Sequence, residues 1–189
     1  MSQYKMIYDD YKKAALKQLK TCRRLESTFR NITSSYERDA VLRSIYYLSG
    51  YIIEGIVNYS LYKVCTFPQN ENVKKLNHSF GTGKKIAFFW RDLNGYIGQK
   101  YVIQNHDFMK NVDVLKVKLP SKFSTIPVLS DGNQNLCLNN LLNNWNVHIR
   151  YHAKNTIFQP FSFETYSEIE IFDFLNLAEE IYIRLPQIV

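Results

Sequence analysis

The residues of this chain best suited to chemistry gather between positions 145 and 152: Trp145, His148, Arg150, Tyr151 and His152. A guanidinium presents a fixed fork of N–H donors to a phosphate, and aromatic rings can stack on a nucleic-acid base. An imidazole titrates near neutral pH and can therefore accept or donate a proton during catalysis. The cluster predicts nucleotide or RNA binding through Trp145, Arg150 and Tyr151, and it leaves acid–base catalysis open.

A structural role fits the same residues about equally well. In that case Trp145 and Tyr151 belong to the core, and Arg150 pairs with an acid of the last helix. His148 and His152 are four residues apart and would share one face of a helix, as two metal ligands do. No third ligand can be recognised, so the sequence predicts neither a metal site nor any other cofactor.

Two lysines outside this cluster follow a glycine-containing segment, Gly81-Thr-Gly83-Lys84-Lys85. A P-loop would need a glycine at position 78 and a Ser or Thr at position 85, where this chain has His78 and Lys85. We reject a P-loop and retain Lys84 and Lys85 as weak basic contacts to a nucleotide or RNA. Glu54, a lone acid in an apolar segment, is expected to have a buried hydrogen bond or ion pair.

The composition favours one globular domain spanning residues 1–189. Apolar residues make up 46% of the chain, enough for a real core. No apolar run reaches the roughly 18–20 residues of a membrane span, and the first residues lack the apolar region of a signal peptide. The three cysteines are far apart and form no CxxC motif. These features predict a cytoplasmic protein with reduced thiols and no membrane association.

The formal net charge of +7 is spread unevenly along the chain. Residues 1–30 hold eight Lys and Arg against three acids, whereas residues 155–189 hold one Arg against six acids. An acidic partner such as RNA or a nucleotide would explain this distribution, and so would solubility alone.

Apolar residues at spacings of three and four predict two long helices, over residues 3–30 and 36–65. The apolar stripe of the first helix consists of Tyr4, Tyr8, Tyr11, Ala15, Leu19, Cys22, Leu25 and Phe29. The second has a wide apolar face that includes Gly50 and Gly55, which predicts close contact with another helix.

The remaining pattern predicts a shorter helix over 73–90, an irregular insertion over 91–134, and helices over 135–154 and 164–185. Alternation in Val112–Leu119 favours a short strand or hairpin within the insertion. We expect Pro186 to stop the last helix. Its buried side is predicted to consist of Ile169, Phe172, Leu175, Leu177, Ala178, Ile181 and Leu185. The expected fold is an all-α, up-and-down bundle of four or five helices.

Four segments in this order resemble the HEPN family of helical bundles. They are the helix from Arg43 to Lys63, the pair Asn77-His78, the triplet Ile149-Arg150-Tyr151, and Ala178-Glu-Glu-Ile181 near the end. The resemblance covers about residues 4–185 apart from the insertion. It implies a nucleotide- or RNA-binding bundle that forms a homodimer. It also implies a toxin–antitoxin or phage-defence setting, with a nucleotidyltransferase-type partner protein.

The chain departs from the ribonuclease members of that superfamily, which carry Arg, four to six residues, and then His. Positions 155, 156 and 157 hold Asn, Thr and Ile, so the resemblance is to the Arg-Tyr type and transfers no ribonuclease site. Two other functions stay open. One is a metal-independent endoribonuclease that uses Arg150 with His148 or His152, and the other is a non-catalytic protein-interaction module.

Overall fold

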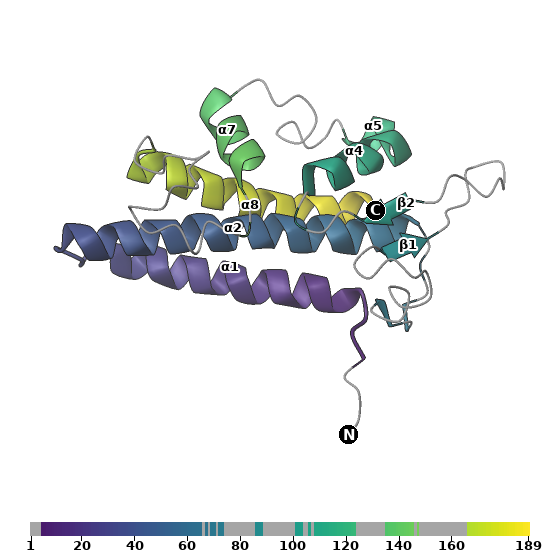
Figure 1. Cartoon of the computed structure of the whole chain (residues 1–189), viewed down its shortest axis with the longest axis horizontal. Helices are drawn as coiled ribbons and strands as arrows, with labels where there is room; N and C mark the ends of the chain where they lie inside the picture. Colours follow the sequence, from purple (N-terminus) through teal and green to yellow (C-terminus); the bar gives the residue numbers. More distant parts are fainter. Residues whose placement is uncertain are drawn as a thin grey trace.

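A computed structural model gives the fold of the chain (Figure 1). It describes residues 5–65, 67, 69–70, 72–73, 86–88, 101–103, 106, 108–123, 135–145, 147 and 166–189. The described part is mostly helical, which confirms the prediction of an all-α fold. One short pair of strands accompanies the helices.

Two long antiparallel helices begin the fold, α1 (Asp9–Phe29) and α2 (Ser35–Val64). The buried residues of α1 lie on the predicted stripe. The turn after α1 ends at Ser34, whose hydroxyl accepts a hydrogen bond from the N–H of Glu37 and caps α2. Residues 49 to 62 of α2 are buried on nearly every side, except for Tyr51, which is partly buried. This burial makes α2 the central helix of the bundle.

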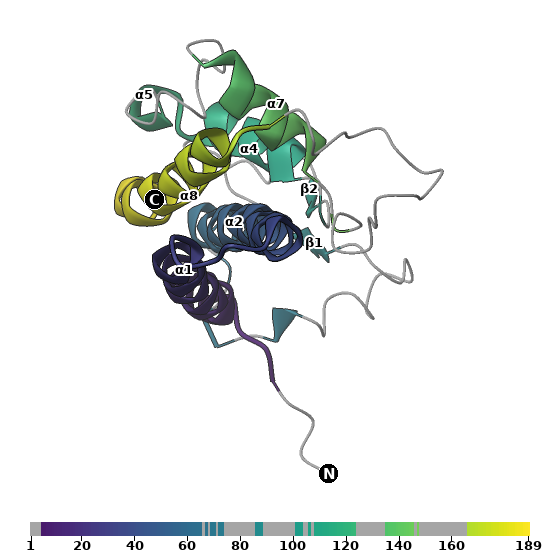
Figure 2. The ribbon, with the colours of Figure 1, turned by 90° about the vertical axis from the view of Figure 1, so that its left-hand side faces the viewer.

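The helix α8 (Glu168–Ile188) packs along the other side of α2, so α2 lies between α1 and α8 (Figure 2). A capping box starts α8: the Ser167 hydroxyl accepts from the N–H of Glu170, whose carboxylate accepts from the N–H of Ser167. Pro186 does not stop the helix as predicted. A proline in the last turn removes only its own backbone hydrogen bond, and α8 continues to Ile188.

The described residues form three further helices, α4 (Phe108–Lys118), α5 (Pro120–Phe123) and α7 (Leu136–Asn144). Of these, α4 packs on α2 and α7 packs on α8. Asn135 caps α7 by accepting from the N–H groups of Cys137 and Leu138. The strands β1 (Ile86–Phe88) and β2 (Tyr101–Ile103) pair antiparallel, with Ala87 opposite Val102.

The structure corrects three predictions about these elements. Residues 86–88 form a strand where part of a helix over 73–90 was expected. The predicted strand in the insertion is helix α4, whose buried residues Asn111, Val112 and Leu115 recur at helical spacing. Ile169, predicted to be buried in α8, is 71% exposed.

Both glycines of α2 make close contacts within the chain, as their positions predicted. A Cβ atom at Gly55 would lie 3.1 Å from the carbonyl oxygen of Tyr11 and 3.3 Å from the Cβ atom of Ala15 in α1. The position of a Cβ atom at Gly50 is occupied by the Trp145 ring. At these two points the glycine-bearing face of α2 is therefore covered by the same chain.

None of the helices in the described part of the chain has the length and apolar character needed to cross a bilayer. The cysteines Cys22, Cys65 and Cys137 are free thiols. Burial raises the pKa of the Cys22 thiol to about 12, which keeps it protonated and unreactive at neutral pH.

Candidate functional site

Of the residues that the sequence singled out for binding or catalysis, the structure describes Trp145 alone. The others lie outside the described residues: Lys84, Lys85, His148, Arg150, Tyr151 and His152.

Trp145 belongs to the core, which is one of the two roles that the sequence left open. Its side chain ends α7 and is only 5% exposed. The indole N–H donates to the carbonyl oxygen of Tyr47 at 3.1 Å. The Trp145 and Tyr51 rings pack edge to face, with their centroids 5.2 Å apart. Because Gly50 lacks a side chain, the ring can lie directly against α2. A base cannot stack on a ring enclosed in this way.

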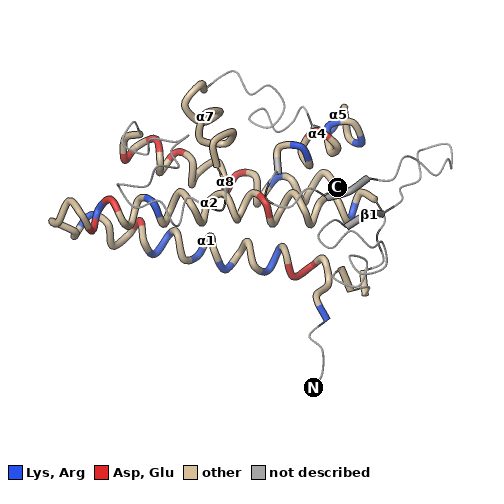
Figure 3. Tube along the Cα trace, in the orientation of Figure 1, with Lys and Arg blue, Asp and Glu red and all other residues tan. Residues whose placement is uncertain are grey.

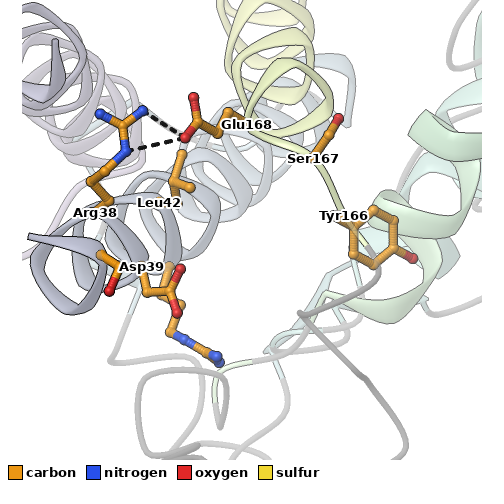
Figure 4. A pocket seen from close by; sticks show the side chains of 8 residues that line it. Arg38, Asp39, Leu42, Tyr166, Ser167 and Glu168 are labelled. Carbon is orange, nitrogen blue, oxygen red and sulfur yellow. Dashed lines mark hydrogen bonds and ion pairs between the residues drawn. The ribbon is translucent and has the colours of Figure 1, made fainter.

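A pocket of about 500 Å³ lies where α2 and α8 begin (Figure 4). It is lined by Ser35, Arg38, Asp39, Leu42, Arg43, Tyr166, Ser167 and Glu168. The first three turns of α2 supply the first five of these residues, and the N-terminal end of α8 supplies the rest. Tyr166 lies across the pocket from Arg38 and Asp39.

Arg38 is the best-fixed side chain in the pocket. Its Nε and Nη2 atoms both donate to Oε1 of Glu168, at 3.2 and 2.6 Å, and its Nη1 donates to the carbonyl oxygen of Ile32. The guanidinium also lies over the ring of Phe29, 4.1 Å from its centroid. Arg38 thus joins the α1–α2 turn to the start of α8, and its charge is largely balanced by Glu168.

Arg43 and Asp39 supply the other charges of the pocket, so its lining holds two cations and two anions. The helix N-termini add partial positive charge, because the first N–H groups of an α-helix have no carbonyl partner within it. Ser34 and Ser167 each accept a hydrogen bond from one of these N–H groups. A phosphate in the pocket would therefore meet Arg43 together with backbone N–H donors.

The edge of the pocket carries aromatic and apolar side chains. Tyr166 is partly buried, and burial, as the largest cause, raises the pKa of its hydroxyl. Two neighbours of the lining residues, Tyr36 and Ile169, are 82% and 71% exposed.

A second polar contact, between Glu54 and His106, joins α2 to the segment before α4. Glu54 is 8% exposed, and the Nδ1 atom of His106 lies 3.2 and 3.3 Å from its two carboxylate oxygens. His106 has a positive φ of 63°, a conformation that few non-glycine residues adopt. The expectation of a buried partner for Glu54 is confirmed, but nothing in the sequence indicated a histidine 52 residues away.

No family model, curated protein or solved structure matches this chain. The resemblance to the HEPN family therefore stays a prediction from four short segments.

Proposed function

We propose that this protein binds a nucleotide, free or as a unit of RNA, in the pocket between the N-terminal ends of α2 and α8. The observation that carries the proposal is the gathering of Arg38, Arg43 and two helix N-termini around one opening of about 500 Å³. This volume falls in the range of roughly 300–1,000 Å³ that is usual for small-ligand pockets.

The lining groups have complementary uses for such a ligand. Arg43 and the backbone N–H groups at the start of α8 suit a phosphate, since charge-assisted hydrogen bonds are the strongest available to it. The carboxylate of Asp39 can accept hydrogen bonds from ribose hydroxyls or from base N–H groups. Tyr166, at the far side of the pocket, provides a ring surface for a base.

The HEPN resemblance adds context to this proposal. It implies a protein of a toxin–antitoxin or phage-defence system, acting as a homodimer with a nucleotidyltransferase-type partner. These remain predictions from the residues quoted above, whereas the pocket is assigned to a nucleotide from its lining residues alone.

Arg43→Ala tests the proposal, because this change removes one cation from the pocket and leaves the Arg38–Glu168 pair in place. Calorimetry with the four ribonucleoside monophosphates should show that the affinity of the preferred one falls by about tenfold or more. Losing a hydrogen bond to a charged group costs about 1.5–3 kcal/mol. Arg184→Ala is the matched control, since Arg184 lies near the far end of α8 and its side chain is 51% exposed.

Equal affinity in wild type, Arg43→Ala and Arg184→Ala would contradict the assignment of the pocket. If neither mononucleotides nor RNA bind at all, the protein-interaction module becomes the better explanation. RNA recovered from the binding assay should also be separated on a denaturing gel in the presence of EDTA. Shortened RNA would support the metal-independent endoribonuclease.

A further inference from the structure

The outward face of α1 carries a row of cations that the pocket does not use. Lys13, Lys17, Lys20 and Arg24 follow one another at intervals of four, three and four residues. At about 100° per residue this spacing keeps all four on one narrow face of the helix, and at 1.5 Å per residue the row is about 16 Å long. We call these four residues the basic row.

The basic row points away from the bundle. The buried residues of α1 are Ala15, Leu19, Cys22 and Phe29, on the opposite side of the helix, and all four members of the row are exposed. Figure 3 shows the basic positions recurring along α1, with acidic residues at its beginning. The row is therefore a solvent-facing surface that the fold itself does not need.

Little negative charge offsets this surface. Lys13 pairs with Asp10 at 3.1 Å, whereas no ion pair to an acid is found for Lys17, Lys20 or Arg24 within the described residues. The neighbouring Arg23, by contrast, pairs with Glu26 and Glu179 and holds α1 to α8. Among the described residues, no acid therefore offsets the charges of Lys17, Lys20 and Arg24, which face outward from the bundle.

We propose that the basic row binds the phosphate backbone of a single-stranded RNA, independently of base sequence. The inference rests on the proposed function in one respect, that the ligand is a nucleic acid, and it extends that function from a nucleotide to a strand. Lys and Arg provide most of the backbone contacts in such complexes. Four cations along about 16 Å can meet several successive phosphates, whereas a mononucleotide could engage only one or two of them.

Two other acidic partners fit the basic row less well. Helices that lie on a membrane surface turn a continuous apolar face to the lipid, and the apolar face of α1 is buried against α2 and α8. The centres of protein–protein interfaces are poor in lysine, and lysine supplies three of the four residues of the row.

The test is the anisotropy of a fluorescein-labelled 20-nucleotide RNA, titrated with protein from 50 to 200 mM KCl. The double variant Lys17→Glu, Lys20→Glu should bind at least tenfold more weakly at 50 mM KCl. Its plot of log affinity against log salt concentration should also be flatter, because each lost phosphate contact removes about 0.7 from a single-strand slope. Lys17→Arg, Lys20→Arg should keep wild-type affinity.

A second double variant, Lys122→Glu, Arg184→Glu, changes net charge by the same amount on α5 and α8. Equal weakening by the two charge reversals would overturn the proposal, because net charge alone would then explain binding. Unchanged RNA affinity in the α1 variant would overturn it too, as would binding of phosphatidylserine vesicles in place of RNA.

The two proposals fail separately in these experiments. Mononucleotide binding that Arg43→Ala weakens and the α1 charge reversal leaves unchanged supports the pocket, whatever the 20-nucleotide RNA does. RNA binding that depends on the basic row and that Arg43→Ala leaves unchanged, without any mononucleotide binding, supports the row and removes the pocket.

Discussion

A buried carboxylate in the central helix is the most unusual single residue of this protein. Burial raises the pKa of Glu54 above its ordinary value of 4.5, and His106 opposes that rise through its charge and its hydrogen bonds. With its Nδ1 atom held by Glu54, His106 is fixed in orientation while its side chain stays 49% exposed.

The raised pKa of Glu54 predicts how stability depends on pH. The folded state holds the Glu54 proton more tightly than the unfolded chain does, so this group stabilises the fold below pH 4.5. That contribution is lost as pH rises through the folded-state pKa. The Glu54→Gln variant cannot ionise at this position. Its free energy of unfolding, relative to that of the wild type, should therefore increase as pH rises from 4.5 to 7.

Urea unfolding at half-unit steps of pH measures this difference. The same comparison in a His106→Gln background should give a larger difference, since His106 lowers the pKa of Glu54. A wild type that instead gains stability relative to Glu54→Gln as pH rises would show that the Glu54–His106 ion pair outweighs the cost of burial.

At the scale of elements, the sequence predicted the long helices well because each buries a continuous stripe. Helices α1, α2 and α8 were expected within a few residues of their observed ends, apart from the start of α1 and the effect of Pro186. The segment of α4 was wrongly predicted to be a strand because its valines alternate with charged residues. The spacing of three between Val112 and Leu115 was equally present, and packing against α2 selected the helix.

The contact between α2 and α7 depends on the absence of a side chain at Gly50. A Cβ atom there would lie 2.0 Å from Nε1 of the Trp145 indole, so Gly50→Ala must displace a buried ring. We expect a loss of about 1–3 kcal/mol in the free energy of unfolding, the usual cost of overpacking a core. Urea denaturation measures it.

Gly55→Ala is the matched control in the same helix. Its Cβ atom would meet Tyr11 and Ala15 at 3.1 and 3.3 Å, a small crowding. The higher helix propensity of alanine, about 1 kcal/mol, offsets this crowding, so little net change is expected. Equal losses at the two positions would mean that Trp145 does not pack closely on Gly50.

At the scale of the whole molecule, the sequence could not reveal the pocket. Arg38 and Glu168 are 130 residues apart, and only the packing of α8 beside α2 brings their helix N-termini together. The sequence instead indicated a site at residues 145–152, where the residue types are suited to nucleotide or RNA binding. Paired charges from two distant elements carry no local signature, because each looks like an ordinary surface residue in its own helix.

The same packing makes α4 part of the central core, although the sequence suggested that it belonged to an insertion. Leu115 is fully buried within the cluster that also contains Ile181 of α8, whereas Val117, two residues further, is 76% exposed. Leu115→Ala should therefore lower the free energy of unfolding by about 2–5 kcal/mol, as Ile181→Ala should, and Val117→Ala should change it little.

Fluorescence and circular dichroism, followed through one urea titration, distinguish the two descriptions of α4. If α4 belongs to the core, both signals of Leu115→Ala will move together to a lower midpoint, as one cooperative transition requires. An early loss of helical signal with an unchanged main transition would show that α4 unfolds separately. In that case the packing of α2 would not depend on α4.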